Sequence, residues 1–209
     1  MAEHYRTQGI ILRKQDAGEA DRVFTVFTKD FGKLKLRAIS ERKITSKLRG
    51  GLEMFCLSEL EFIQGKTKKT LTDALLENRY THIRNDLGRL KIAYRILEAL
   101  DAIVHGQEPD ENIWNLLMKT FTFLNREELD EKTIRFVPHY FLWNLLSHAG
   151  YKPQSSDIKR EFPRLADLLK IFLQEDIEQG LQKMRFQDIP EDVLRTISHE
   201  YLSKFLENC

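Results

Sequence analysis

Hydrophobic and polar residues follow two different periods along this chain, one before residue 80 and another from residue 85 onward. Over residues 33–40, the apolar side chains alternate with Lys33, Lys35 and Arg37. A period of two indicates a strand with one buried face, and here the outer face is basic. The same alternation, bounded by turn residues, predicts further strands at 8–14, 22–28, 55–63 and 70–76. Five short strands, with an irregular or helical segment over 41–53 between the third and fourth, predict a five-stranded OB-type barrel.

The later period is that of helices. Leu87, Leu90, Tyr94 and Leu97 recur at spacings of three and four behind an Asn85/Asp86 cap. We expect further helices at 110–124, 130–149 (kinked at Pro138), 164–173 and 191–206. The prediction is therefore an α+β chain, with an OB-type barrel over residues 1–80 followed by an all-helical domain over 81–209.

Composition limits the class of protein. Of the 209 residues, 42% are hydrophobic and 31% are charged, which excludes a disordered chain. No apolar run approaches the roughly 20 residues of a membrane-spanning helix, so no membrane contact is expected. Residues 1–13 lack the pattern of a secretory signal, and we expect the protein in the cytosol. Cys56 and Cys209 are too few for a disulfide framework or a cysteine zinc site.

Motifs for enzymatic chemistry are missing. Gly65-Lys66-Thr67 resembles the end of a phosphate-binding loop, but Leu60 stands where such a loop needs glycine, which favours a basic hairpin turn. The six histidines have no metal-binding spacing, and there is no Gly-x-Ser-x-Gly motif. We therefore predict no catalytic residues, no metal and no cofactor, and a protein that is not an enzyme.

Basic residues are concentrated in one segment although the formal net charge is only +1. Residues 29–49 hold eight basic and two acidic residues, a local excess that is typical of polyanion contacts. The candidate nucleic-acid-binding residues here are Lys33, Lys35, Arg37, Arg42, Lys43, Lys47 and Arg49. The alternative is a solvated face that protects a sheet edge.

Two other groups near this segment allow two interpretations each. The aromatic side chains of Phe24, Phe27 and Phe31 are candidates for base stacking, or else part of the core. The turn carrying Asp16, Glu19 and Asp21 is acidic, which indicates a structural role or a protein contact rather than a nucleic-acid loop.

A second basic group is expected in the helical part. Arg84, Lys91 and Arg95 are spaced by seven and four, which places them on one helix face with Arg89 near its edge. This face would continue a nucleic-acid track or receive an acidic peptide. The alternative is an ordinary solvated helix face.

Taken in order, these segments resemble the RecO family of bacterial DNA repair and recombination mediators. The residues that carry the resemblance are Gly9–Leu12, Asp16–Arg22, Phe27-Thr28, Gly32-Lys33, Arg42-Lys43, Ser46-Lys47, Gly50, Leu52, Phe55, Ile83–Leu87, Tyr94–Asp101, Gly106–Pro109 and Leu145–Pro153.

The resemblance implies an N-terminal OB-fold, a helical domain and no enzymatic turnover. It also implies binding of single- and double-stranded DNA and annealing of complementary strands. The implied partners are RecR, the acidic tail of single-stranded DNA-binding protein and, indirectly, RecA. Many members hold zinc with four cysteines in the helical half, whereas this chain has Cys209 alone there, so zinc is not expected.

Three functions therefore stand beside one another. The first is a DNA-binding recombination mediator. The others are a protein-interaction adaptor with a merely solubilising basic face, and an RNA-binding accessory factor, because phosphate contacts and stacking serve both polymers.

Overall fold

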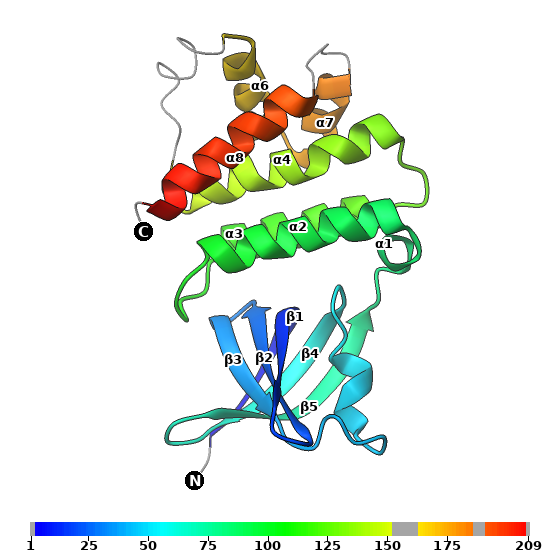
Figure 1. Ribbon diagram of the computed structural model, residues 1–209, viewed down its shortest axis with the longest axis vertical. Coiled ribbons are helices and arrows are strands. Elements are labelled where there is room, and N and C mark those ends of the chain that lie inside the picture. The colour runs from blue at the N-terminus through cyan, green and yellow to red at the C-terminus, as the bar shows by residue number, and fades with distance from the viewer. Residues whose placement is uncertain (1–2, 152–162, 186–190, 208–209) are drawn as a thin grey trace. The chain divides into compact units, whose positions relative to one another are not determined.

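The computed structural model describes residues 3–151, 163–185 and 191–207, and Cys209 lies outside these ranges. The chain divides into two compact units (Figure 1). The first comprises residues 1–84 and 105–114, and the second comprises 85–104 and 115–209. The sequence predicted a single boundary after residue 80. The division differs from it because the segment at 105–114 joins the strands of the first unit.

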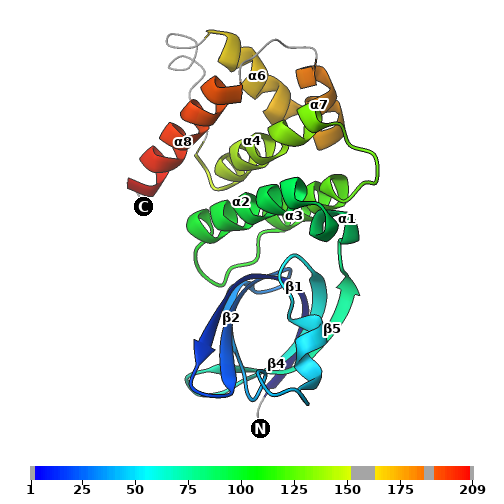
Figure 2. The same ribbon diagram turned by 45° about the vertical axis from the view of Figure 1, so that its right-hand side comes forward.

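The first unit is a closed barrel of five strands in the order β1-β2-β3-β5-β4 (Figure 2). The strands are β1 (Glu3–Ala17), β2 (Asp21–Thr28), β3 (Gly32–Ala38), β4 (Leu57–Gln64) and β5 (Lys69–Asn78). Neighbouring strands are antiparallel except β3 and β5, which pair in parallel. A short 3₁₀ helix, η1 (Lys47–Gly51), precedes β4. The predicted α+β class with an N-terminal five-stranded barrel is confirmed.

Inward side chains of the strands fill the barrel. In β3 the predicted alternation holds, because Leu34 and Leu36 are buried while Lys35 is exposed. The register shifts once between Ile11 and Arg13 in β1, and twice in the β4–β5 pair, at Leu57/Ser58 and at Glu61/Phe62. Such bulges interrupt the period of two. The strands are therefore less regular than the alternation predicted. The strand β1 is also longer than the predicted strand at 8–14.

The helical elements are α1 (Thr81–Asn85), α2 (Leu87–Ile103), α3 (Glu111–Leu124), α4 (Glu131–His148), α6 (Pro163–Gln174), α7 (Ile177–Arg185) and α8 (Glu191–Glu207). Asp86 and Asp130 cap α2 and α4 by accepting hydrogen bonds from the backbone N–H groups three residues later. The helix α4 runs through Pro138 without ending there. The sequence predicted neither α1 nor α7. No helix of the described residues has both the length and the apolar character needed to cross a membrane.

The buried face of α2 agrees with the predicted one at Leu97 but not at Leu87 and Tyr94. Leu87 and Tyr94 were expected to face the core, yet they are 67% and 50% exposed. The buried series instead starts at Arg89 and continues through Ile92/Ala93 and Ile96/Leu97. Arg89 is buried because its guanidinium donates to the carbonyl oxygens of residues 124, 126 and 127 after α3. A charged residue thus occupies the core-facing position at the start of the helix.

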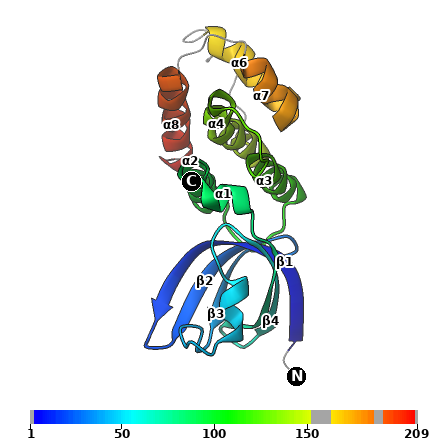
Figure 3. The same ribbon diagram turned by 90° about the vertical axis from the view of Figure 1, so that its right-hand side faces the viewer.

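In the second unit, α4 packs against α2, α6, α7 and α8 (Figure 3). Its Trp143 is fully buried and donates through Nε1 to Oγ of Ser198 in α8, at 3.2 Å. Nδ1 of His139 lies 2.9 Å from the same oxygen. Burial, helped by Arg95 and Arg195, lowers the pKa of His139 from 6.5 to about 4. His139 is therefore neutral at pH 7.

This buried histidine predicts a loss of stability in mild acid. The unfolded chain takes up a proton near pH 6.5 whereas the folded chain resists it until about pH 4. The contribution of neutral, buried His139 to the free energy of unfolding is therefore complete above pH 6.5. It is lost as the pH falls toward 4, at about 1.4 kcal/mol per pH unit. The substitution His139→Gln should make the fall in unfolding free energy between pH 7 and pH 5 smaller by about 2 kcal/mol.

Chemical denaturation at the two pH values measures this difference. The matched control is His148→Gln, because His148 is exposed at the end of the same helix. An equal pH dependence in His139→Gln and wild type would contradict the assignment.

Candidate nucleic-acid interface

A groove of about 720 Å³ lies on the barrel where β3 meets the β4–β5 hairpin. Five basic residues line it: Lys33, Lys35 and Arg37 from β3, and Lys68 and Lys69 from the hairpin. The other lining residues are Ala17, Val23, Thr25, Gln64, Thr67, Gly106 and Gln107. None of the lining residues in the described part of the chain is acidic or aromatic. We call this feature the lysine groove.

The strand topology brings the two basic groups together. Leu36 pairs with Lys69 and Arg37 pairs with Thr70 in the parallel β3–β5 ladder. The hairpin turns just before this point, where the Gly65 N–H donates to the Lys68 carbonyl at 2.9 Å. Gly65-Lys66-Thr67 therefore belongs to a hairpin, as predicted. The hairpin places its lysines beside the outward row of β3.

A segment following α2 completes the lysine groove. The Lys33 N–H donates to the Gly106 carbonyl at 3.1 Å, and Lys69 Nζ donates to Oε1 of Gln107 at 2.8 Å. Gly32 permits this approach because its φ is +59° and a Cβ there would lie 2.4 Å from the Glu108 carbonyl oxygen. The first unit thus holds residues 105–108 in place against β3.

The charges of the lysine groove are not equally available. Arg37 donates through Nε and Nη2 to Oδ2 of Asp21, at 3.0 and 2.7 Å. The Ser40 N–H and the Arg37 guanidinium hold the pKa of Asp21 below its usual range, so the carboxylate remains ionised. Lys35 and Lys68 are exposed, and no carboxylate of the described residues pairs with either. These two lysines are the most available charges for a ligand.

The acidic β1–β2 turn, for which a structural role or a protein contact was predicted, has a structural role. Besides the Asp21–Arg37 pair, Asp16 accepts from Nε of Arg22 at 2.8 Å and lies 3.5 Å from Arg42 Nη1. The Arg22 guanidinium also contacts the buried carboxylate of Glu41. These contacts anchor the start of the β3–β4 connection to the β1–β2 turn.

The other basic residues of this segment do not line the lysine groove. Arg42 and Lys43 lie in the β3–β4 connection, and Lys47 and Arg49 lie in η1. At the end of η1, a Cβ on Gly51 would lie 2.3 Å from the Ala74 carbonyl, so this helix packs closely on β5. The candidate residues of this segment thus lie partly in the lysine groove and partly in the β3–β4 connection and η1.

The predicted helix face of Arg84, Lys91 and Arg95 is wrong as a group. Arg84 lies in α1, which Asp86 separates from α2. Its guanidinium is 2.7 Å from Glu53 and donates to the Met54 carbonyl at 2.9 Å, so it stabilises the first unit. Lys91 and Arg95 remain exposed on α2.

Of the two interpretations of the phenylalanines, the structure supports the core for Phe24 and Phe27, while Phe31 is half-buried against that core. Phe24 and Phe27 are at most 1% exposed. The Phe27 ring packs against Trp114, with ring centroids 5.9 Å apart. Phe31 packs edge-on against Tyr5 and Phe62. No described aromatic side chain therefore lines the lysine groove.

Sequence reasoning did not include Lys68, Lys69 and Gln107 in the site. The sequence feature that could have added the two lysines to the site is the basic composition of the hairpin turn, because Lys66, Lys68 and Lys69 fall within four residues. Gln107 carries no such indication, because only the fold brings it to β3.

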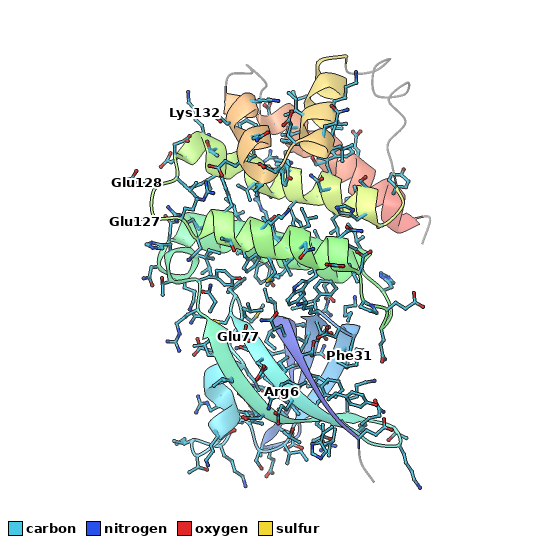
Figure 4. All side chains as sticks on the ribbon, turned by 180° about the vertical axis from the view of Figure 1, so that it is seen from behind. Arg6, Phe31, Glu77, Glu127, Glu128 and Lys132 are labelled. Carbon is cyan, nitrogen blue, oxygen red and sulfur yellow. The ribbon has the colours of Figure 1, made fainter. Side chains whose placement is uncertain are left out.

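Another part of the barrel wall, formed by β1, β4 and β5, has the opposite character. There Arg6 contacts Glu59 and Glu61, and Gln8 donates to Glu77 at 2.7 Å (Figure 4). This wall thus carries carboxylates beside its arginine, whereas the described residues that line the lysine groove include none. Among the described residues there is no group of three or more potential metal ligands of the His, Cys, Asp and Glu types.

Comparison with known proteins agrees with this architecture. Residues 1–80 match the family model described as recombination protein O N terminal, and residues 84–158 match the model described as recombination protein O C terminal. The chain belongs to the RecO family.

Curated RecO relatives support this assignment. The chain is 34% identical over 150 residues to the DNA repair protein RecO of Dehalococcoides mccartyi, covering 72% of this chain and 58% of that protein. It is 33% identical over 150 residues to the DNA repair protein RecO of Roseiflexus sp., covering 72% and 51% respectively. This RecO-family chain therefore spans little more than half the length of these relatives.

The unequal charges of the lysine groove predict unequal effects of substitution. Lys35→Gln removes an available charge and should lower the salt slope of single-stranded DNA binding by about 0.7. The double substitution Asp21→Asn/Arg37→Gln removes one positive and one negative charge that already pair with each other. It should therefore change the salt slope less than Lys35→Gln does. Fluorescence anisotropy at several salt concentrations measures both slopes.

The control is Arg6→Gln, which removes a basic residue from the β1–β4–β5 wall. It should leave DNA binding unchanged, and Lys35→Gln and Arg6→Gln should each unfold within about 0.5 kcal/mol of wild type, as surface substitutions usually do. Equal slopes for Lys35→Gln and Arg6→Gln would remove the lysine groove from consideration.

Proposed function

We propose that this chain is a non-enzymatic recombination mediator in DNA repair, and that its lysine groove binds the phosphate backbone of single-stranded DNA. The observation that carries the proposal is the lysine groove itself, with five basic and no acidic lining residues in the described chain. Membership of the RecO family supports the repair role.

The spacing of the lysine groove suits a sugar-phosphate chain. Outward side chains two residues apart on a strand are separated by about 7 Å, similar to neighbouring phosphates in an extended strand. Lys33, Lys35 and Arg37 form such a row, and Lys68 and Lys69 face it from the hairpin. Contacts to phosphates carry no sequence information, so binding would be sequence-independent.

Annealing follows from the same electrostatics. Two complementary strands repel each other through their phosphates, and lysines that neutralise some phosphates reduce this repulsion. Backbone binding also leaves the base edges open for pairing. No covalent step is needed, so neither nucleotide nor metal would be consumed.

The wider role of the RecO relatives extends to this chain as part of the proposal. It comprises binding of double-stranded DNA, contacts with RecR and with the acidic tail of single-stranded DNA-binding protein, and assistance in loading RecA onto coated strands in the cytosol. The exposed Lys91 and Arg95 on α2 are the proposed basic contacts of the helical unit.

Salt dependence tests the binding step. Each neutralised phosphate should contribute about −0.7 to the slope of log affinity against log salt for a single strand. Anisotropy titrations with mixed-sequence and homopolymer DNA should give similar affinities and a clearly negative slope. A flat salt response would exclude phosphate binding, and a marked preference for RNA of the same sequence would favour the RNA-binding alternative.

An annealing assay tests the mediator role. The chain should accelerate pairing of complementary strands, naked or coated with single-stranded DNA-binding protein, without ATP and in the presence of a chelator. Deleting the acidic tail of the coating protein should abolish acceleration on coated strands only. A requirement for ATP or metal would contradict the mechanism. Equal activity on tailed and tailless coats would contradict tail docking alone.

A further inference from the structure

The β3–β4 connection, residues 39–46, presents an apolar side chain to solvent. Ile44 is 92% exposed, and Ile39 in the same connection is 56% exposed. Exposure of a whole isoleucine side chain forgoes the free energy that its burial would give. We therefore consider Ile44 as a candidate contact for another molecule.

The start of the connection is anchored to residues 20 and 22, at the β1–β2 turn and the beginning of β2. The Arg42 N–H donates to the Ala20 carbonyl at 3.0 Å, and the buried Glu41 carboxylate contacts Arg22. Two successive turns follow, in which the Lys43 and Ser46 N–H groups donate to the Ser40 and Lys43 carbonyls at 3.1 and 3.0 Å. These bonds hold the backbone on both sides of Ile44, so its exposure is a property of the fold.

The sequence around Ile44 is basic, although Arg42 already contacts Asp16 of the β1–β2 turn. Arg42, Lys43, Lys47 and Arg49 follow one another with no acidic residue between Glu41 and Glu53. The preferred ligand is therefore a polyanion that also offers an apolar surface, which describes the exposed bases of a single-stranded nucleic acid. An anionic membrane offers both as well, but one isoleucine buries less apolar area than a single acyl chain, which itself gives only marginal membrane binding.

We propose that Ile44 contacts a nucleobase of bound single-stranded DNA and separates it from its neighbour in the stack. Apolar side chains, isoleucine among them, act in this way between base steps of other DNA complexes. The basic neighbours of Ile44 contact the flanking phosphates. This inference rests on the proposed function, in which the lysine groove holds the DNA strand only through its phosphate backbone. The contact with Ile44 would add a contact to a base.

The test uses the full chain and a single-stranded oligonucleotide carrying 2-aminopurine, whose fluorescence rises when the base is unstacked. Wild type should raise this fluorescence at saturation. Ile44→Ser should bind about tenfold more weakly and lose the rise. It should keep the wild-type salt slope because no charge is removed. Ile44→Leu should retain the rise.

Two controls separate this contact from general effects. Leu75→Ser removes another exposed apolar side chain, 63% exposed on β5 between Asp73 and Glu77, and should behave as wild type. Lys35→Gln should lower affinity and salt slope but keep the full fluorescence rise at saturation.

The outcomes distinguish the two proposals. If wild type fails to bind DNA, the proposed function falls together with this inference. If Ile44→Ser matches wild type in affinity and fluorescence, the base contact is wrong while binding in the lysine groove stands. Sedimentation with phosphatidylserine vesicles completes the test. Ile44-dependent vesicle binding combined with Ile44-independent DNA binding would assign the connection to a lipid surface and overturn the inference.

Discussion

The parallel pairing of β3 with β5 is the contact on which the barrel and its lysine groove depend. The strands β1, β2 and β3 follow one another as antiparallel neighbours, and β4 and β5 form a hairpin. Two residue pairs, Leu36 with Lys69 and Arg37 with Thr70, join β3 to β5. So short a ladder contributes few hydrogen bonds, and side chains such as Leu34, Phe62 and Leu71 that fill the barrel must stabilise its closure. The same pairing places the lysines of the hairpin beside the basic row of β3, so closure of the core creates the candidate site.

Arginine and lysine have different tasks on this barrel. Four arginines of the first unit join separate parts of the chain through carboxylates: Arg6 with Glu61, Arg22 with Glu41, Arg37 with Asp21, and Arg84 with Glu53. The planar guanidinium suits such fixed contacts. Lys35 and Lys68 have no carboxylate partner among the described residues, and the lysine ammonium is a hydrated point charge on a flexible stem. The positive charge available to a ligand is therefore set by which cations the fold leaves unpaired rather than by the net charge of +1.

The sequence was sufficient for features that depend on neighbouring residues. Alternation in β3 and the cap at Asp86 are such features, and the structure has both. The sequence was insufficient where contacts with distant segments determine whether a side chain is buried or lines the lysine groove. Arg89 is buried where carbonyl groups of residues 124–127 accept from it, and Tyr94 faces solvent although its spacing fits a buried face. Phe27 is buried because Trp114, 87 positions later in the chain, covers it. Lys69 joins the lysine groove through pairing with β3, which no local pattern indicates.

The packing of the phenylalanines has a consequence for the proposed chemistry. A protein that promotes strand pairing must hold two backbones while leaving the base edges accessible, and aromatic walls would compete with pairing because they retain bases by stacking. Phe24 and Phe27 are instead enclosed in the first unit, and the described walls of the lysine groove are aliphatic and polar. The side chain of Ile44 has no π-face, so it can separate neighbouring bases without offering a surface as favourable as the complementary strand. Weak, salt-sensitive backbone contacts together with such a transient base contact would allow the paired duplex to leave, which strong stacking would hinder.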